Sequence, residues 1–206
     1  MMPGNALSPI LEYAPFLYPD NIPVFNTTDY ELGGIGLADA SQGLQVQAWF
    51  LQITGPVSAN NVVISSSNTS PTVLFTAPDV TEVSLSFDQN MRPAVAYVSA
   101  GNSYFWWYDT TIPGYTVITL TGATNPRCTL DDKRAAEISL GLSDIILAYL
   151  KGTNLYIRQQ RDRFTIEYFL KDLSTLLPNP SLNKIGMNSI PATGRLQFQI
   201  FGNLWA

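Results

Sequence analysis

Histidine is absent from this 206-residue chain, and cysteine occurs once, at Cys128. Histidine is the commonest general base near neutral pH and the commonest metal ligand, so its absence removes the usual hydrolase and metalloenzyme templates. A single cysteine cannot form a disulfide within the chain, and without histidine it lacks the base of a papain-type nucleophile. We expect no catalytic residues, metal or cofactor, and a buried thiol at Cys128.

Charge is also scarce, because charged side chains make up only 13% of the residues. Duplex binding draws on clustered lysines and arginines, so the net charge of −5 argues against sequence-specific nucleic-acid binding. No apolar run approaches the roughly 20 residues of a membrane-spanning helix. The first residues lack the basic and apolar regions of a secretory signal. These features predict a protein made in a reducing cytosol, without a membrane span.

Glycine and proline are plentiful, at 14 residues each, and hydrophobic residues make up 46% of the chain. Both residue types punctuate sheets and are unfavourable inside helices, and the hydrophobic content is that of a packed globular protein. The composition therefore favours an all-β fold.

A proline-rich segment, residues 1–28, opens the chain. Because proline disfavours helix and central strand, and because exposed aromatic side chains are unfavourable in solution, we expect an extended arm lying on a surface of its own or a neighbouring chain. A disordered tail is the alternative. The prolines are Pro3, Pro9, Pro15, Pro19 and Pro23, and the expected aromatic anchors are Tyr13, Phe16, Tyr18 and Phe25.

Internal similarity is the most informative feature. The segment Ala94–Tyr97 recurs at Ile146–Tyr149, with a weaker copy at Val46–Trp49, so the period is about 50 residues. Within each copy, apolar and polar residues alternate as in half-buried strands. We expect about three tandem, four-stranded antiparallel units, like propeller blades, in a single domain 29–206. The units are 29–78, 79–121, 122–172 and a partial unit 173–206.

The expected strands follow this alternation. They lie near 33–38, 44–52, 61–65 and 72–76 in the first unit, 82–87, 93–98, 103–108 and 115–120 in the second, and 127–131, 144–150, 154–159 and 164–170 in the third; a hairpin at 183–187 and 195–201 follows, and one helix is expected at 131–142. So few units close only as a small propeller completed by the arm, or stay open and cover their exposed faces by oligomerising. We favour assembly.

Arginines gather at Arg158, Arg161 and Arg163, with Arg134 one strand earlier. Guanidinium groups bind carboxylates bidentately, so one interpretation is a pocket for an acidic sugar. The other is a polar rim, in which Asp162 pairs with Arg161 or Arg163 across a turn, or a salt bridge between subunits.

The densest aromatic patch contains Trp106, Trp107 and Tyr108. Successive side chains of a strand face opposite ways, so Trp106 and Tyr108 should share one face, and Phe105 and Trp107 the other. Three roles remain open for this patch: internal core, subunit interface and glycan contact.

Two segments, Phe87–Tyr97 and Ser143–Phe164, resemble structural proteins of tailed bacteriophages, and the similarity covers residues 30–200. The resemblance implies degenerate sialidase-like β repeats without the catalytic set, in a tail, nozzle or neck component. Nozzle proteins with propellers are much longer, so the resemblance implies an accessory or fibre-docking piece.

We therefore expect a non-enzymatic virion protein, assembled in the host cytoplasm, that forms a symmetric homo-oligomeric ring and contacts other tail or neck proteins. A glycan- or host-receptor-binding module of a phage tail is the alternative.

Overall fold

The structure is a computed structural model, and it describes residues 30–37, 46–66, 69–88, 90, 92–131, 144–175, 184–190 and 195–201. The proline-rich arm with Tyr13, Phe16, Tyr18 and Phe25 lies outside these residues, as do residues 132–142 of the expected helix.

The described residues form β1 to β14 and two short 3-10 turns, which confirms the all-β expectation. Sheet A contains β1 (Tyr30–Leu37), β2 (Val46–Thr54), β3 (Asn60–Ser66) and β4 (Thr69–Ala77); sheet B contains β5 (Val80–Phe87), β6 (Pro93–Ser99), β7 (Asn102–Asp109) and β8 (Gly114–Thr119); sheet C contains β9 (Thr124–Asp131), β10 (Asp144–Lys151), β11 (Asn154–Gln159) and β12 (Tyr168–Asp172); β13 (Lys184–Ile190) and β14 (Arg195–Phe201) form a hairpin, sheet D.

Sheets A, B and C are meanders in which each strand pairs antiparallel with the next strand along the chain. The strands of sheet B lie within about two residues of those expected from alternation. Its central hairpin turns at Ala100 and Gly101, whose φ angles of 47° and 74° match a two-residue turn that suits the twist of paired strands.

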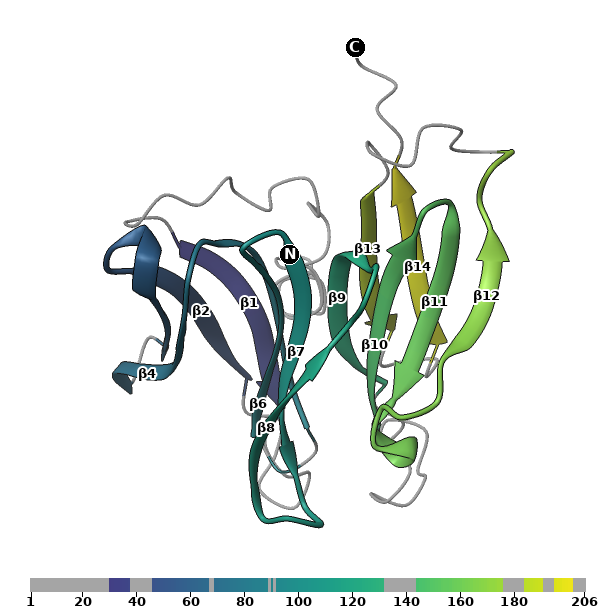
Figure 1. Cartoon of the computed structure of the whole chain (residues 1–206). Helices are drawn as coiled ribbons and strands as arrows, with labels where there is room; N and C mark the ends of the chain where they lie inside the picture. Colours follow the sequence, from purple (N-terminus) through teal and green to yellow (C-terminus); the bar gives the residue numbers. More distant parts are fainter. Residues whose placement is uncertain are drawn as a thin grey trace, which may run out of the picture.

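The sheets pack face to face in the order A, B, C and D; in Figure 1 sheets A, B and C follow one another from left to right, and hairpin D overlaps sheet C. Separate hydrophobic cores fill the spaces between A and B, between B and C, and between C and D. Strand β10 is buried along almost its whole length because it lies in an inner sheet. Ile145, Leu147 and Tyr149 face sheet B, whereas Ile146 and Ala148 face sheet D.

The first strands of successive sheets contact one another: β1 contacts β5, β5 contacts β9, and β9 contacts β13. In Figure 1 the later strands of sheets A and C lie away from this inner row. Side chains fix the links between sheets. The amide oxygen of Asn60 accepts a hydrogen bond from the Val80 backbone at 2.9 Å, and the Ser103 hydroxyl donates to the Ala123 carbonyl at 2.8 Å.

The last strand of sheet C begins four residues later than expected, at Tyr168 instead of position 164. Residues Gln160–Asp162 form a 3-10 turn, and Phe164 follows it with an exposed fraction of 0%. The apolar side chain that suggested a strand start is instead a core residue at the end of a turn.

Candidate functional site

The loop between β11 and β12 carries two of the three arginines predicted as site residues. Arg163 and Phe164 are both in the left-handed region, with φ angles of 51° and 55°. Two successive non-glycine residues rarely adopt this conformation, and such strain persists only where the surroundings hold it. The Phe164 ring supplies that hold, because it packs edge-on against Phe105 at 4.7 Å and Trp107 at 4.8 Å.

Both exposed arginines of this loop bind carboxylates on other strands. Arg163 donates through Nη2 to Asp109 of β7 at 2.5 Å, and Arg161 donates through Nε to Asp144 of β10. The expected pairing with Asp162 is therefore wrong: the Asp162 carboxylate accepts a hydrogen bond from the Tyr168 hydroxyl at 2.7 Å instead. In this turn the guanidinium groups of Arg161 and Arg163 bind carboxylates of neighbouring strands and not that of Asp162.

The third arginine, Arg158, belongs to a different network centred on the hydroxyl of Tyr149. Arg158 Nε donates to this hydroxyl at 2.8 Å, and the hydroxyl donates to Glu167. Lys151 Nζ donates to the same carboxylate at 2.9 Å. Arg158 also donates to the Phe164 carbonyl at 2.9 Å, so this network and the strained loop are connected.

A tyrosine, a glutamate and an arginine are the groups of a sialidase nucleophile, yet the electrostatics here favour a neutral phenol. Burial, followed by the hydrogen bond to Glu167, raises the pKa of Tyr149 above its ordinary value. Burial opposes ionisation of Glu167, but hydrogen bonds from Lys151 and Tyr149 outweigh it and hold the pKa of this carboxyl below its ordinary value. Tyr149 is 0% exposed, and its neutral hydroxyl joins Arg158 and Glu167 through hydrogen bonds. We call this buried link a structural lock.

The aromatic patch lies inside the chain, on the two faces expected from strand alternation. Trp106 packs in the core between sheets A and B and stacks on Tyr115 at 3.9 Å. Trp107 packs between sheets B and C. Both indoles are about 5% exposed, at 6% and 4%, so neither offers a ring face to a glycan. Tyr108 is half-buried, under the guanidinium of Arg92 at 4.3 Å.

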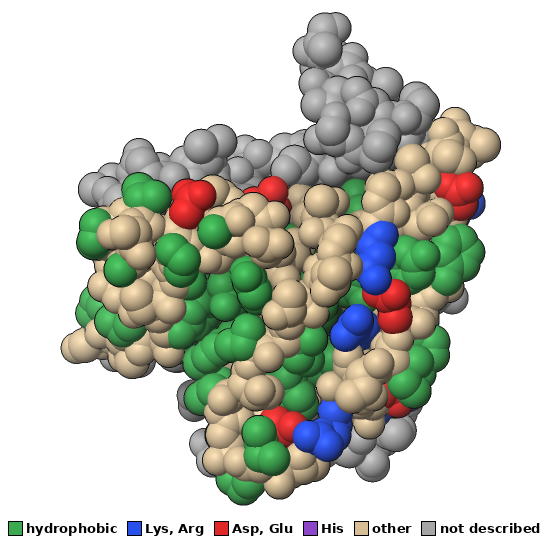
Figure 2. Space-filling view, in the orientation of Figure 1, with side chains coloured by type: hydrophobic (Ala, Val, Ile, Leu, Met, Phe, Trp, Pro, Cys, Tyr) green, Lys and Arg blue, Asp and Glu red, His purple; other side chains and the backbone are tan. Residues whose placement is uncertain are grey.

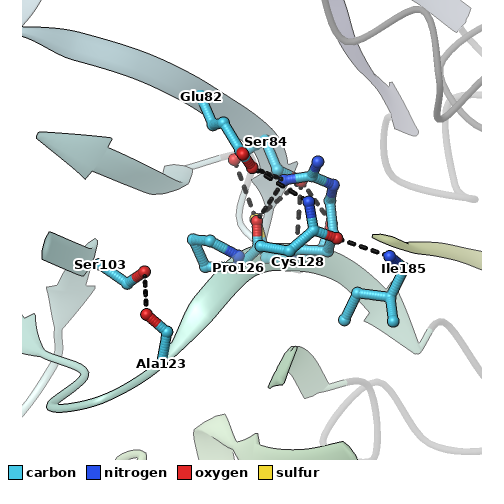
Figure 3. A network of polar contacts seen from close by, with 9 residues as sticks. Glu82, Ser84, Ser103, Ala123, Pro126, Cys128 and Ile185 are labelled. Carbon is cyan, nitrogen blue, oxygen red and sulfur yellow. Dashed lines mark hydrogen bonds and ion pairs between the residues drawn. The ribbon is translucent and has the colours of Figure 1, made fainter. Parts of the chain in front are cut away.

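A buried polar junction joins sheets B, C and D, and the sequence analysis missed it (Figure 3). Glu82 of β5 binds Nη1 of Arg127 at 3.2 Å and accepts a hydrogen bond from Asn125 at 3.1 Å. The amide oxygen of Asn125 in turn accepts from the Ile185 backbone of β13 at 2.5 Å. Strand alternation places Asn125 and Arg127 on one face, which was the available signal.

Cys128 is 1% exposed, and its thiol donates to the Ser84 carbonyl at 3.1 Å. The buried thiol expected from the sequence is confirmed. Arg127, its neighbour in sequence, binds Glu82, so the guanidinium is directed to a carboxylate.

The outermost strand of sheet C, β12, exposes every side chain. Its exposed apolar residues, with Ile166 just before it, are Ile166 at 49%, Tyr168 at 36%, Phe169 at 56% and Leu170 at 42%. In the described part of sheet C, β12 pairs only with β11, so its other backbone edge is unpaired there.

Comparisons with protein-family models, curated proteins and solved structures find no match to this chain. Within the described ranges, no helix is long and apolar enough to cross a membrane. The same residues contain no group of three histidine, cysteine or acidic side chains placed to hold a metal ion.

Proposed function

We propose that this chain is a non-enzymatic structural component of a bacteriophage tail or neck, and that it binds its own copies and neighbouring virion proteins. The phage assignment is supported by the resemblance of Phe87–Tyr97 and Ser143–Phe164 to tail structural proteins. The assembly role is supported by the structure of β12.

The β12 edge carries this proposal. Among the described residues this backbone edge has no partner strand, and it is flanked by Phe169 and Leu170, which are 56% and 42% exposed; such an edge is a template for pairing with another chain. Sheet proteins usually protect such edges with charge, and here two of the five residues, Lys171 and Asp172, are charged, which leaves Tyr168, Phe169 and Leu170 as the apolar part of the edge. A partner strand would cover both the backbone groups and the apolar side chains.

The predicted arginine site supports a structural role over a glycan pocket. Each of Arg158, Arg161 and Arg163 already binds an acceptor of this chain. A sugar carboxylate would have to displace Asp144 or Asp109 from its guanidinium.

The arrangement of the sheets supports a blade-like repeat. Inner strands that contact in sequence order, with four-stranded meanders stacked beside them, are the local geometry of propeller blades. We propose that the sheets form an open array of such blades, in which other subunits cover the outer faces.

Light scattering of the full chain over a range of concentrations tests this proposal. We expect association that Phe169→Lys weakens, with the fold unchanged, because that side chain is largely in solvent. Ile112→Lys, at a 58% exposed apolar position in the turn between β7 and β8, is the matched control and should leave association intact. A monomer at every concentration, with the same mass in both variants, would count against assembly through β12.

A further inference from the structure

A second apolar surface lies between sheets A and B, where Figure 2 shows a hollow with hydrophobic side chains gathered along it. We call it the aromatic groove and define it by Phe75 of β4 and by Tyr97, Tyr104, Trp106 and Tyr115 of sheet B. Tyr97 and Trp106 are buried beneath it, Phe75 and Tyr104 are half-buried, and Tyr115 is exposed. Phe75 lies 4.7 Å from the Tyr97 ring and 5.3 Å from the Trp106 ring.

The rings of sheet B form a continuous row across three strands. Tyr97 stacks on Tyr104 with ring centroids 5.3 Å apart, and Trp106 stacks on Tyr115 with an interplanar angle of 2°. The row opens to solvent at Tyr115, which is 43% exposed, beside Val117 at 49%. Flat faces therefore continue from the core to the surface.

The phenol groups of this row are unused donors. Among the described residues, no hydrogen bond joins the hydroxyl of Tyr97, Tyr104 or Tyr115 to another group, although Tyr97 is only 5% exposed. Burial, followed by the proximity of Tyr104, raises the pKa of Tyr97 to about 12, so this phenol remains a neutral donor at physiological pH. The Tyr97 hydroxyl is not one of the buried polar atoms of the described residues that lack a partner, so solvent reaches it, and a ligand with carbonyl acceptors can accept its hydrogen bond.

Proline-rich segments have the matching chemistry. In the polyproline II conformation they present flat pyrrolidine rings and unpaired backbone carbonyls, and they dock in grooves lined by aromatic side chains. This chain carries such a segment, since residues 1–28 contain five prolines among the anchors Tyr13, Phe16, Tyr18 and Phe25. At about 3.1 Å per residue the arm can span roughly 90 Å, enough to reach a neighbouring subunit.

We propose that the aromatic groove binds the proline-rich arm, residues 1–28, of a neighbouring copy. Tyr115, which is 43% exposed, and the half-buried Tyr104 supply aromatic faces for the prolines, and the tyrosine hydroxyls are donors for the backbone carbonyls. The inference rests on the proposed function in one respect, that copies of the chain meet in an assembly. Recognition of the arm by the groove is measured separately from assembly.

The first experiment titrates a synthetic peptide of residues 1–28 into the full-length protein and follows tryptophan fluorescence. The peptide contains no tryptophan, so the signal comes from the protein, including Trp106 in the groove. We expect saturable binding that Tyr97→Phe weakens about two- to tenfold, the effect of one hydrogen bond. Tyr115→Ala should weaken it roughly tenfold or more, because it removes the exposed aromatic face.

Two controls make this titration specific. Tyr168→Phe removes an exposed phenol outside the groove and should leave the affinity unchanged. A peptide with all five prolines replaced by alanine should bind more weakly, because it loses the preformed conformation. An unsaturable signal, equal affinity in all variants, or binding of a neutral oligosaccharide in place of the peptide would each overturn the proposal.

A second experiment identifies the neighbour as the donor of the arm. One full-length variant carries Tyr13→Ser, Phe16→Ser and Tyr18→Ser, and another carries Tyr115→Ala. We expect each to associate more weakly alone than the unaltered chain, and an equal mixture to recover part of the loss, since one supplies the groove and the other the arm. If arm substitutions leave association unchanged, the inference fails while assembly through β12 stands; if the chain is always monomeric, assembly fails and the peptide titration alone decides recognition.

Discussion

Arg163 and Asp109 form an ion pair between sheets C and B, with Nη2 and Oδ2 2.5 Å apart. The pair sits directly beside Phe164, which is fully buried against sheet B. The short segment Arg161–Phe164 thus contacts two strands, β10 through Asp144 and β7 through Asp109, and the core between sheets B and C through Phe164. We call the segment Arg161–Phe164 the latch.

Phe164 and Arg163, the two parts of the latch, should contribute unequally to the free energy of unfolding. Phe164→Ala should lower the free energy of unfolding by about 3–5 kcal/mol, because it empties a buried aromatic site between two sheets. Arg163→Gln should cost much less, because its guanidinium is half exposed and solvent screens the pair. Urea unfolding of both variants checks this order. Equal losses, or a larger loss for Arg163→Gln, would mean that the ion pair and not the ring holds the sheets together.

The hydroxyl of Tyr149 should contribute more to stability than that of its neighbour Tyr156. Tyr149→Phe removes a donor to Glu167 and an acceptor for Arg158, and we expect a loss of about 1–3 kcal/mol in stability. Tyr156→Phe is the matched control, since its hydroxyl makes no hydrogen bond in the described part of the chain, and its effect should stay within about 0.5 kcal/mol. Similar small losses in both variants would contradict the assignment of Tyr149 as a structural lock.

The polar junction of Figure 3 predicts that substitution of Glu82, on β5, lowers the stability of the protein. Glu82→Gln keeps the shape of the side chain but removes the negative charge beside Arg127, whose side chain is 5% exposed. We expect a loss on the order of 2 kcal/mol, because removing one charge of a largely buried pair leaves the other undercompensated. Asp79→Asn, at an exposed turn, serves as the control and should change stability by less than about 0.5 kcal/mol. A neutral Glu82→Gln would show that the remaining contacts of Arg127 suffice.

Stability should fall at alkaline pH because of the buried tyrosines. The pKa of Tyr97 is raised from 10.0 to about 12, so its contribution is complete below pH 10 and is lost as the pH rises through 12. Tyr149 is shifted in the same direction. Unfolding midpoints measured between pH 8 and pH 12 should decline above pH 10, and less steeply in Tyr97→Phe. An identical decline in that variant would show that ionisation of Tyr97 does not contribute to the loss of stability.

Local pattern was enough to place the strands of sheets A and B and most of sheet C to within about three residues, because each alternates apolar and polar residues or has a glycine-containing turn beside it. Strand β10 broke the alternation, yet its continuous apolar run fitted a strand buried on both faces. The start of β12 was misplaced because nothing local distinguishes Phe164 at the end of a turn from Phe164 at the start of a strand.

Partners of the charged residues were not predictable in the same way. Asp162 is the nearest carboxylate in sequence to Arg163, but Asp109 lies closer in space through the stacking of sheets B and C. Glu82 and Arg127 likewise meet only once β5 lies beside β9. Pairings of this kind depend on the tertiary arrangement, which a strand pattern alone does not contain.

The most direct test of the central claim, that the free edge of the array is covered by another chain, is hydrogen exchange at the backbone amides of β12, residues Tyr168–Asp172. If a partner strand pairs with this edge, the outward-facing amides should exchange slowly at high protein concentration and quickly on dilution, while those of β10 stay protected throughout. Fast exchange of the outward-facing β12 amides at every concentration would contradict the account.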